Sequence, residues 1–359
     1  MCPRCTLVQL KHTAPQEILY TRHYWYRSGV TTTMMAALRD VTEAAERVAD
    51  LQDGDLVLDI GSNDGTLLRS YSKNVIKVGV EPATNLAEEG AKGLDFFIND
   101  FWSYASYYGC IGKQAKVITA CGMFYDLEDP NKFIKDVASA LAPDGVFIAQ
   151  LMCLRNMVNI GDVGNFAHEH LEFYTLKSLD WLLGHHGLEI FDIQINDVNG
   201  ESYRLFIRHK SLRWPDPKHV VRELMKTEVE LHKPEFYQDF FFMMEHNKVQ
   251  CVDFITHMKK QGKRIWVYGA STKGNVILQY YSLDHTLIDG ASDRSPEKHG
   301  LYTVGSGIPI YSEQEARAAN PDFFLVLPYA VLPEFIKREV EWQARGGQWI
   351  VPLPSFRVI

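Results

Sequence analysis

The stretch Leu56-Val57-Leu58-Asp59-Ile60-Gly61-Ser62-Asn63-Asp64-Gly65 is an apolar run that ends near an acidic residue and then turns through small residues. A buried strand, a Gly-rich turn and a helix start are typical of the first unit of a doubly wound α/β domain. Further apolar runs at 75–80, 116–120 and 146–151 alternate with helical stretches. This alternation predicts a parallel sheet with helices packed on it.

Later segments predict how this domain ends. Apolar runs at 188–195 and 203–208 predict an antiparallel pair of strands that completes the sheet. Two prolines in Trp214-Pro215-Asp216-Pro217 predict a boundary, because proline stops regular structure. The stretch 218–261 has a helical pattern interrupted at Pro234, and we interpret it as a helical connector.

A second strand, turn and helix is predicted from Arg264 to Asn275. Apolar runs at 286–289 and 323–327 follow it and again alternate with helical segments. The last third of the chain is therefore predicted to be a second α/β unit.

Composition limits the possible functions. The chain has 359 residues, of which 46% are hydrophobic and 23% charged, and a formal net charge of −8. This charge argues against a nucleic-acid partner, because phosphate backbones are bound by clustered Lys and Arg. No apolar run approaches the roughly 18 residues of a membrane helix, and the N-terminus lacks the layout of a secretory signal. We expect a cytoplasmic protein with a small-molecule substrate.

The turn after the first strand predicts the type of ligand. Asn63 stands where a dinucleotide-binding fingerprint would have a second glycine close to a pyrophosphate. S-adenosylmethionine has no pyrophosphate and needs an acidic partner for its amino group and a carboxylate for its ribose. Glu81 closes the next strand, about twenty residues on, and suits the ribose hydroxyls, while Asp100 and Phe101 suit the adenine edge. The alternative is a purely structural turn.

The full set of residues predicted to form the donor pocket follows from these positions and their neighbours. It consists of Asp59, Gly61, Ser62, Asn63, Asp64, Gly65, Glu81, Pro82, Asp100, Phe101 and Cys121.

A second constellation, His168-Glu169-His170, follows the fourth strand of the predicted sheet. An imidazole beside a carboxylate is the minimal apparatus for proton abstraction at neutral pH, because the carboxylate can hold the histidine in one tautomer. Metal ligation is the weaker alternative, since the spacing is not that of a helical His-Glu-x-x-His site and no third ligand is evident. Surface or capping histidines are the third interpretation.

Cys2 and Cys5 have the spacing of half a zinc site, but a structural zinc needs four ligands and no second pair is visible. We expect no closed metal site within this chain. The other cysteines are scattered, as expected in a reducing compartment.

Six motifs together resemble the nucleotide-sugar C-methyltransferases of antibiotic deoxysugar pathways, such as the mycarose and tetronitrose enzymes. The motifs lie at Cys2–Leu10, Tyr24–Gly29, Leu58–Gly65, Gly79–Pro82, His168–His170 and Tyr268–Asn275. The resemblance runs nearly end to end. It implies a class I methyltransferase domain with a Rossmann-like doubly wound sheet, S-adenosylmethionine as donor, a second Rossmann-like α/β domain, and a zinc module of which this chain holds a truncated remnant.

The resemblance also implies a domain plan and an acceptor. The domains are 1–45 (zinc-module remnant and entry helix), 46–212 (methyl-donor domain), 213–261 (helical connector) and 262–359 (C-terminal Rossmann-like domain). The substrate is expected to be a nucleotide sugar, bound by a monomer or homodimer. Residues assigned to the substrate are Tyr24, Tyr26, Ser28, His168, Asn199, Lys273 and Asn275. Lys273 would meet a diphosphate at a helix start, although a turn that only stabilises the domain is the alternative.

In this family a base takes a proton from the carbon beside a 4-keto group, and the enolate attacks the methyl sulfonium. The resemblance assigns His170 as the base, with Glu169 beside it. This chain departs from the family pattern in three places. Ala167 stands where the family has a Tyr, and Tyr125-Asp126 lies where the family has a His. Asn199-Gly200-Glu201 replaces a His-Gly-Gly turn. Tyr125 and Asp126 join the catalytic candidates. O- or N-methylation of another polar metabolite, or donor binding without chemistry, remain alternatives.

Overall fold

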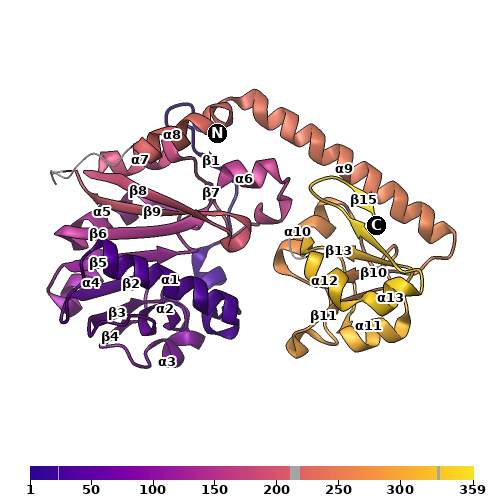
Figure 1. The fold of residues 1–359 in the computed structure, drawn as a ribbon, viewed down its shortest axis with the longest axis horizontal. Coiled ribbons are helices and arrows are strands. Elements are labelled where there is room, and N and C mark those ends of the chain that lie inside the picture. Colours follow the sequence, from indigo (N-terminus) through magenta and orange to yellow (C-terminus); the bar gives the residue numbers. More distant parts are fainter. Residues whose placement is uncertain (23, 211–218, 330–331) are drawn as a thin grey trace. The chain divides into compact units, whose positions relative to one another are not determined.

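The computed structural model describes residues 1–22, 24–210, 219–329 and 332–359. Contacts divide this chain into two compact units, each with its own sheet (Figure 1). The first unit contains Met1–Leu154 and His168–His232, and the second contains Arg155–Ala167 and Lys233–Ile359. The boundary predicted at 214–217 lies outside the described residues.

The first unit is built on a seven-stranded sheet in the order β4-β3-β2-β5-β6-β9-β8. Its strands are β2 (Leu56–Ile60), β3 (Ile76–Val80), β4 (Phe96–Ile98), β5 (Ala115–Cys121), β6 (Leu141–Met152), β8 (Leu188–Asn196) and β9 (Ser202–His209). The neighbours from β4 to β6 pair in parallel, and β9 pairs antiparallel with both β6 and β8. The doubly wound sheet and the closing antiparallel pair are both confirmed.

Helices cover both faces of this sheet. They are α1 (Thr32–Val48), α2 (Thr66–Arg69), α3 (Ala87–Gly90), α4 (Tyr104–Ile111), α5 (Pro130–Ala140), α7 (Leu176–His185) and α8 (His219–Thr227). Side chains of α1 and α2 pack with alternate strand residues such as Val57 and Val117 in one buried cluster. The intervening residues Leu58 and Ile118 are also buried. Burial on both faces explains why the parallel strands are continuous apolar runs.

The start of the chain adds a short strand to the first unit. β1 (Val8–Gln9) pairs antiparallel with β7 (Glu172–Phe173), with Val8 opposite Phe173. Before it, the backbone N–H of Thr6 donates to the carbonyl of Cys2 at 3.0 Å, which closes a turn around Cys2 and Cys5. Within the described ranges, no three His, Cys, Asp or Glu side chains are grouped to hold a metal ion.

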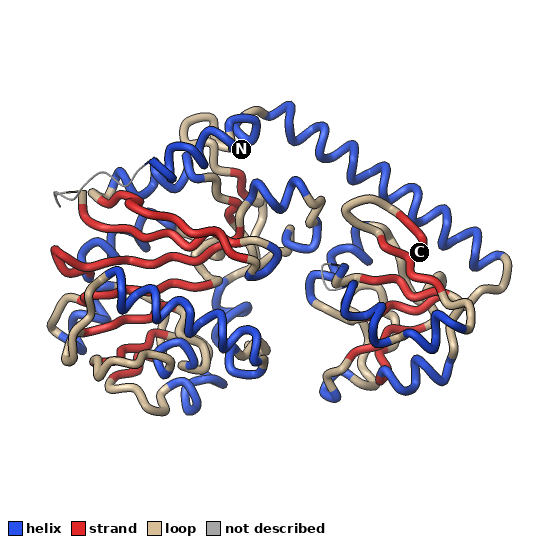
Figure 2. The backbone as a smooth tube through the Cα atoms, in the orientation of Figure 1, coloured by secondary structure: helices blue, strands red, loops and turns tan. Residues whose placement is uncertain are grey.

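The second unit holds a six-stranded sheet in the order β12-β11-β10-β13-β14-β15 (Figure 2). Its strands are β10 (Ile265–Tyr268), β11 (Gly290–Asp293), β12 (Ile310–Ser312), β13 (Phe323–Val326), β14 (Gln348–Val351) and β15 (Arg357–Val358). Its helices are α9 (Pro234–Lys260), α10 (Thr272–Tyr280), α11 (Glu313–Ala319), α12 (Leu332–Arg338) and α13 (Val340–Ala344), and α6 (Leu154–Asn159) begins where the first unit ends. All strand pairs are parallel except β14 with β15. The second α/β unit is confirmed.

Two features of this unit refine the sequence analysis. Pro234 is the first residue of α9, where its missing N–H is not needed, so the predicted interruption is a helix start. The strand predicted at 286–289 is wrong. The side-chain carboxylate of Asp284 accepts the backbone N–H of Thr286 at 2.9 Å, and the backbone carbonyl of Asp284 accepts the N–H of Ile288. These bonds form a turn, so the strand begins only at Gly290.

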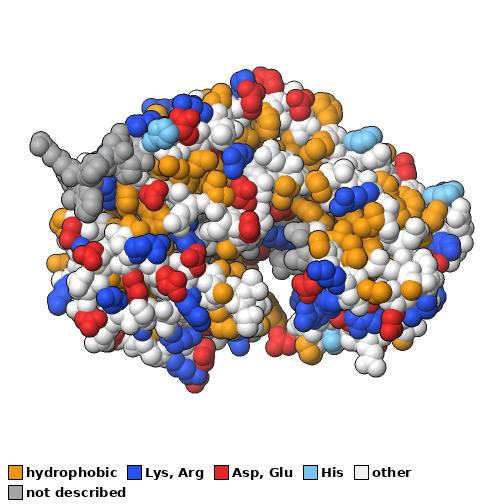
Figure 3. All heavy atoms as spheres, in the orientation of Figure 1, with side chains coloured by type: hydrophobic (Ala, Val, Ile, Leu, Met, Phe, Trp, Pro, Cys, Tyr) orange, Lys and Arg blue, Asp and Glu red, His pale blue; other side chains and the backbone are white. Residues whose placement is uncertain are grey.

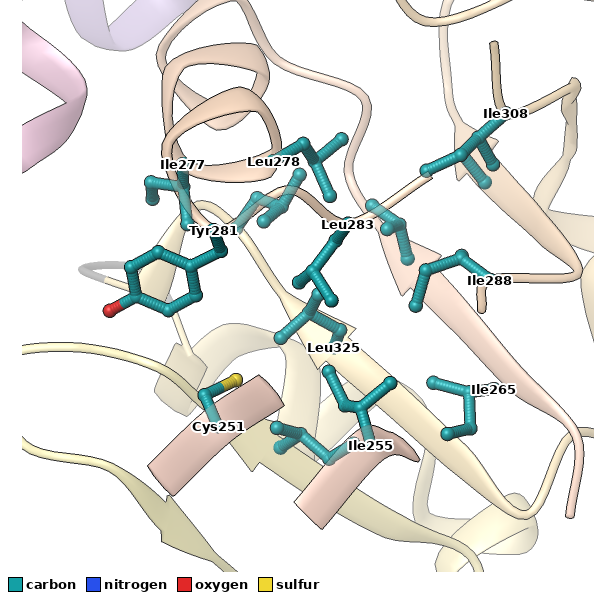
Figure 4. Packing of buried hydrophobic residues seen from close by; sticks show 14 of the residues in the cluster. Cys251, Ile255, Ile265, Ile277, Leu278, Tyr281, Leu283, Ile288, Ile308 and Leu325 are labelled. Atoms are coloured by element: carbon teal, nitrogen blue, oxygen red, sulfur yellow. The ribbon is translucent and has the colours of Figure 1, made fainter. Parts of the chain in front are cut away.

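Apolar side chains from α9, α10 and the strands fill the core of the second unit (Figure 4). Cys251 and Ile255 of α9, Ile277 of α10 and Leu325 of β13 are all at most 1% exposed. Val163, from the segment 155–167, joins the same cluster. That packing explains why this segment belongs to the second unit although the chain returns afterwards to the first.

The surface carries mixed charge. Acidic and basic side chains are interspersed over the visible face of each unit (Figure 3). A search of the described residues finds no helix that combines the length and apolar character needed to cross a membrane.

Candidate active site

The turn after β2 lies where the order of the first sheet reverses. β2 has β3 on one side and β5 on the other, and all three run in parallel. Loops that leave the carboxyl ends of such strands diverge and leave a crevice in which ligands bind. Gly65 closes the turn with φ 78°, and a Cβ there would lie 2.7 Å from the carbonyl oxygen of Gly90. The turn therefore depends on glycine at this position.

Glu81, directly after β3, is held by backbone N–H groups on both carboxylate oxygens. Its Oε2 accepts the N–H of Asn63 at 2.8 Å, and its Oε1 accepts the N–H of Ala83 at 2.9 Å. Burial raises the pKa of this carboxyl, and the two N–H groups oppose the rise. A carboxylate offers about four acceptor positions, so each oxygen keeps capacity for a ribose hydroxyl. Its role towards the ribose of a donor stays a prediction.

Asp59 is buried near the end of β2 and bonded to its neighbour strand. Its Oδ1 accepts the hydroxyl of Thr119 at 2.5 Å. Burial raises the pKa of this carboxyl to about 7, although the Thr119 hydroxyl acts in the opposite direction. Burial, followed by the charge of Asp59, also raises the pKa of the Cys121 thiol at the end of β5. An ammonium group brought to Asp59 would favour its charged form, which fits the amino group of a methionine-type donor.

The side chains of Asn63 and Asp64 bind another part of the protein. Asn63 Oδ1 accepts the backbone N–H of Ser28 at 2.9 Å, and its Nδ2 donates to the carbonyl of Tyr26 at 3.0 Å. Asp64 Oδ2 accepts the N–H of Gly29 at 2.7 Å. Both residues were assigned to the donor from the sequence, but these contacts lie 35 or more residues away in the chain. Sequence reasoning missed this second role.

The catalytic candidates from two distant segments meet after β5. The carbonyl of Tyr125 accepts the N–H groups of both Leu171 and Glu172 at 2.9 Å. The rings of Tyr125 and His170 are 4.9 Å apart and nearly perpendicular. The structure thus brings together four residues, Tyr125, Asp126, Glu169 and His170, while His168 is exposed at the start of the turn. Their catalytic role stays a prediction.

Asp126 lies among acidic and phenolic groups. Burial raises its pKa well above the usual range, the charges of Glu169 and Glu172 raise it further, and a hydrogen bond with Tyr20 opposes the rise. Its Oδ1 is buried and has no hydrogen-bond partner among the residues that the structure describes. The hydroxyl of Tyr20 donates to the backbone carbonyl of Glu169 at 3.2 Å. A carboxyl in such surroundings is favoured in its protonated form.

Comparisons with known proteins show the family of this chain. A family model described as a C-methyltransferase C-terminal domain matches residues 197–354, and one described as a methyltransferase domain matches residues 32–193. The C-methyltransferase NovU of Streptomyces niveus is 30% identical over 373 residues, which cover 100% of this chain and 86% of that protein. The chain belongs to the C-methyltransferase family. It is a class I methyltransferase, and S-adenosylmethionine is its methyl donor.

Solved structures resemble part of this C-methyltransferase. An S-adenosylmethionine-dependent methyltransferase from Clostridium acetobutylicum ATCC 824 is 16% identical with a TM-score of 0.40, over 49% of this chain and 92% of that one. Magnesium protoporphyrin IX methyltransferase ChlM from Synechocystis PCC 6803, with bound S-adenosylmethionine, is 14% identical with a TM-score of 0.35, over 48% of this chain and 79% of that one.

The residues predicted to contact the adenine of the donor follow β4, the strand next to β3. Asp100 is exposed and its Oδ1 accepts the N–H of Phe101, whereas the neighbouring Asn99 donates from Nδ2 to the carbonyl of Glu81 at 2.7 Å. Asn99 was not predicted, although it directly precedes Asp100. The side chain of Asn199 lies outside what the structure describes.

Lys273 and Asn275 belong to the second unit. They lie in the first turn of α10, which Ser271 caps by accepting the N–H of Gly274 at 3.0 Å. Lys273 Nζ is 4.0 Å from Asp162 Oδ2, and burial lowers the pKa of this ammonium. The position of the lysine at a helix start is as predicted, and its carboxylate neighbour was not evident from the sequence.

Glu172 makes the stability of the C-methyltransferase depend on pH. Burial raises the pKa of its carboxyl from 4.5 to about 8, opposed by the N–H of Leu127. The folded protein therefore holds a proton that the unfolded chain releases. The resulting stabilisation is fully present below about pH 4.5 and is lost as the pH rises through about 8, by at most about 1.4 kcal/mol per pH unit.

Replacing Glu172→Gln is expected to remove this dependence, because glutamine is neutral at every pH. Urea unfolding between pH 5 and pH 9 should show a smaller fall in the free energy of unfolding for this variant than for the wild type. Glu128→Gln, at an exposed position, is the matched control and should follow the wild type. Parallel profiles for Glu172→Gln and the wild type would contradict the assignment.

Proposed function

We propose that this enzyme methylates the carbon beside the ketone of a nucleoside-diphosphate 4-keto-deoxysugar. The observation that carries the proposal is the position of His170 against the Tyr125 ring, next to Glu169 and Asp126. A carbon beside a ketone becomes a nucleophile only when a base removes its proton, and histidine is the side chain best suited to this near neutral pH. Methylation of a carbon beside a ketone needs such a base.

The proposed reaction balances as one proton transfer and one methyl transfer. His170 takes the proton from the carbon beside the carbonyl, and the electrons of the broken C–H bond form the enolate. When bound, S-adenosylmethionine supplies an electrophilic methyl group on a sulfonium. The enolate carbon forms the new C–C bond while the C–S bond breaks, and the proton stays on His170 until solvent removes it.

The remaining residues bind and orient the reactants in this proposal. Glu81 receives the ribose hydroxyls of the donor, and Asp59 receives its amino group, because each carboxyl lies at a strand end beside the same turn. A neutral Asp126 can donate a hydrogen bond to the enolate oxygen, as other carboxyls that are kept protonated in active sites do. Lys273 meets a diphosphate through its charge and through the start of α10.

The test is a panel of nucleoside-diphosphate 4-keto sugars with methyl-labelled S-adenosylmethionine. We expect one sugar to gain the label, and NMR should place the new methyl on the carbon next to the ketone. Methyl attached to oxygen or nitrogen would overturn the proposal. So would tight donor binding with no turnover on any member of a panel that covers the common nucleotides and epimers.

A further inference from the structure

Residues 24–30, which we call the strap, are held to the donor pocket by side chains of two of its loops. The amide of Asn85, after β3, makes a reciprocal pair with the backbone of Tyr24: its Oδ1 accepts the N–H at 2.9 Å and its Nδ2 donates to the carbonyl at 3.0 Å. Asn63 and Asp64, after β2, bind Tyr26, Ser28 and Gly29 in the way described above. Side chains from both loops therefore bind the backbone of the same short segment.

These bonds use the backbone of the strap. Among its aromatic side chains, that of Tyr24 is partly buried, whereas those of the next two residues are exposed. Trp25 is 71% exposed and Tyr26 is 47% exposed. A segment with little buried apolar area has low local stability and opens easily. The position of the strap beyond Tyr24 consequently depends largely on the few side chains that bind its backbone.

Asn63 has a special place among them because it contacts the strap and the donor carboxylate at once. Its backbone N–H donates to Glu81 Oε2 at 2.8 Å while its side-chain amide binds Ser28 and Tyr26. It is 7% exposed and adopts φ 53°, a left-handed conformation that asparagine tolerates better than most residues. Its conformation therefore links the donor carboxylate to the strap.

We propose that Asn63 is a positioning residue that couples occupancy of the donor pocket to closure of the strap. A donor whose ribose binds Glu81 fixes that carboxylate, which fixes the Asn63 backbone and thereby its side-chain amide. The ordered amide then holds Ser28 and Tyr26. Because such coupling is reciprocal, a closed strap also strengthens donor binding.

The coupling has a consequence for the acceptor, and this part rests on the proposed function. Tyr24 and Ser28 are substrate-contact candidates carried by the strap. Donor binding then prepares the acceptor site, so that the donor binds first and the acceptor second. The coupling itself does not require the acceptor to be known, and it is tested with S-adenosylmethionine alone.

The experiment is hydrogen–deuterium exchange of the full chain with and without S-adenosylmethionine. In the wild type, we expect the donor to slow exchange at the N–H groups of Ser28 and Gly29. Asn63→Gly keeps the left-handed backbone and its N–H to Glu81 but removes the amide, so this donor-dependent protection should disappear. Donor affinity by calorimetry should fall about 10-fold, as expected for the loss of two hydrogen bonds.

Asp50→Gly is the matched control. Asp50 also has a left-handed backbone, with φ 48°, but it is exposed, and its carbonyl and Oδ1 accept from the side chain of the nearby Gln52. It should retain both the protection of the strap and the donor affinity of the wild type. A loss of protection in this control would mean that left-handed glycine substitutions act through general flexibility, which would overturn the role given to Asn63.

Gly29→Ala tests the same coupling without a change in the donor loop. A Cβ on Gly29 would lie 2.8 Å from the Thr66 hydroxyl oxygen and 3.0 Å from Asp64 Oδ2, so it pushes the strap away from the loop. It should also weaken donor binding, although the contacts of Gly29 are with Asp64 and Thr66 and not with Glu81. Donor-dependent protection that persists in Asn63→Gly, or is missing in the wild type, would overturn the proposal. If no sugar of the panel described above were methylated, these exchange and affinity measurements would be unaffected. That result would count only against the proposed acceptor.

Discussion

Glu81→Ala is expected to weaken S-adenosylmethionine binding by about 100-fold or more. Two ribose hydroxyls that donate to one buried carboxylate form charge-assisted hydrogen bonds, each worth about 1.5–3 kcal/mol. The carboxylate also orders the turn, because its oxygens accept the N–H groups of Asn63 and Ala83. Alanine removes both effects together. Isothermal calorimetry with S-adenosylmethionine or its demethylated product measures the loss directly.

Two further variants separate donor binding from general damage. Glu88→Ala removes an exposed carboxylate on α3, a few residues along the chain, and should bind the donor as the wild type does. Glu81→Gln keeps the size of the side chain but replaces one acceptor oxygen by an N–H₂ group, so its affinity should fall as well. Thermal melting shows whether each variant is folded. Unchanged affinity in a folded Glu81→Ala would remove Glu81 from the donor site.

His170→Asn is expected to lower turnover by about 100-fold or more while donor affinity stays near that of the wild type. General acid–base groups commonly contribute about 10²- to 10⁴-fold, and asparagine cannot accept the proton. The imidazole must be neutral to act as the base, so wild-type activity should also fall at acidic pH. The measurements are turnover per folded molecule on the methylated sugar and donor affinity by calorimetry.

A carbon-acid assay checks the same residue without methyl transfer. With the keto sugar in deuterated water and no donor, the wild type should exchange the proton beside the ketone, and His170→Asn should not. The exposed His246→Asn on α9 is the control and should retain turnover. If His170 were only structural, its replacement would lower the melting temperature and leave activity per folded molecule nearly intact. Full turnover in His170→Asn would contradict the role of base, and Asp126 would be tested next.

The local elements of this fold could be predicted from the sequence alone. The turn from Asp59 to Gly65, the antiparallel pair β8 and β9, and the second strand–turn–helix at 264–275 all depend on apolar periodicity and glycine placement. These signals lie within ten or twenty residues and act on the backbone directly. The strand misplaced at 286–289 shows the limit, since an aspartate that caps a turn outweighed the apolar pattern.

Only the tertiary structure decided what the polar side chains of the site do. Asn63 and Asp64 bind backbone groups 35 residues or more away, and Tyr125 meets Leu171 and Glu172 from more than 45 residues away. Glu172 was not predicted as a site residue, because its charge state depends on burial. A hydrogen bond or a pKa depends on which groups share a small volume. That arrangement follows from packing of the whole unit, whereas local periodicity determines only the elements that are packed.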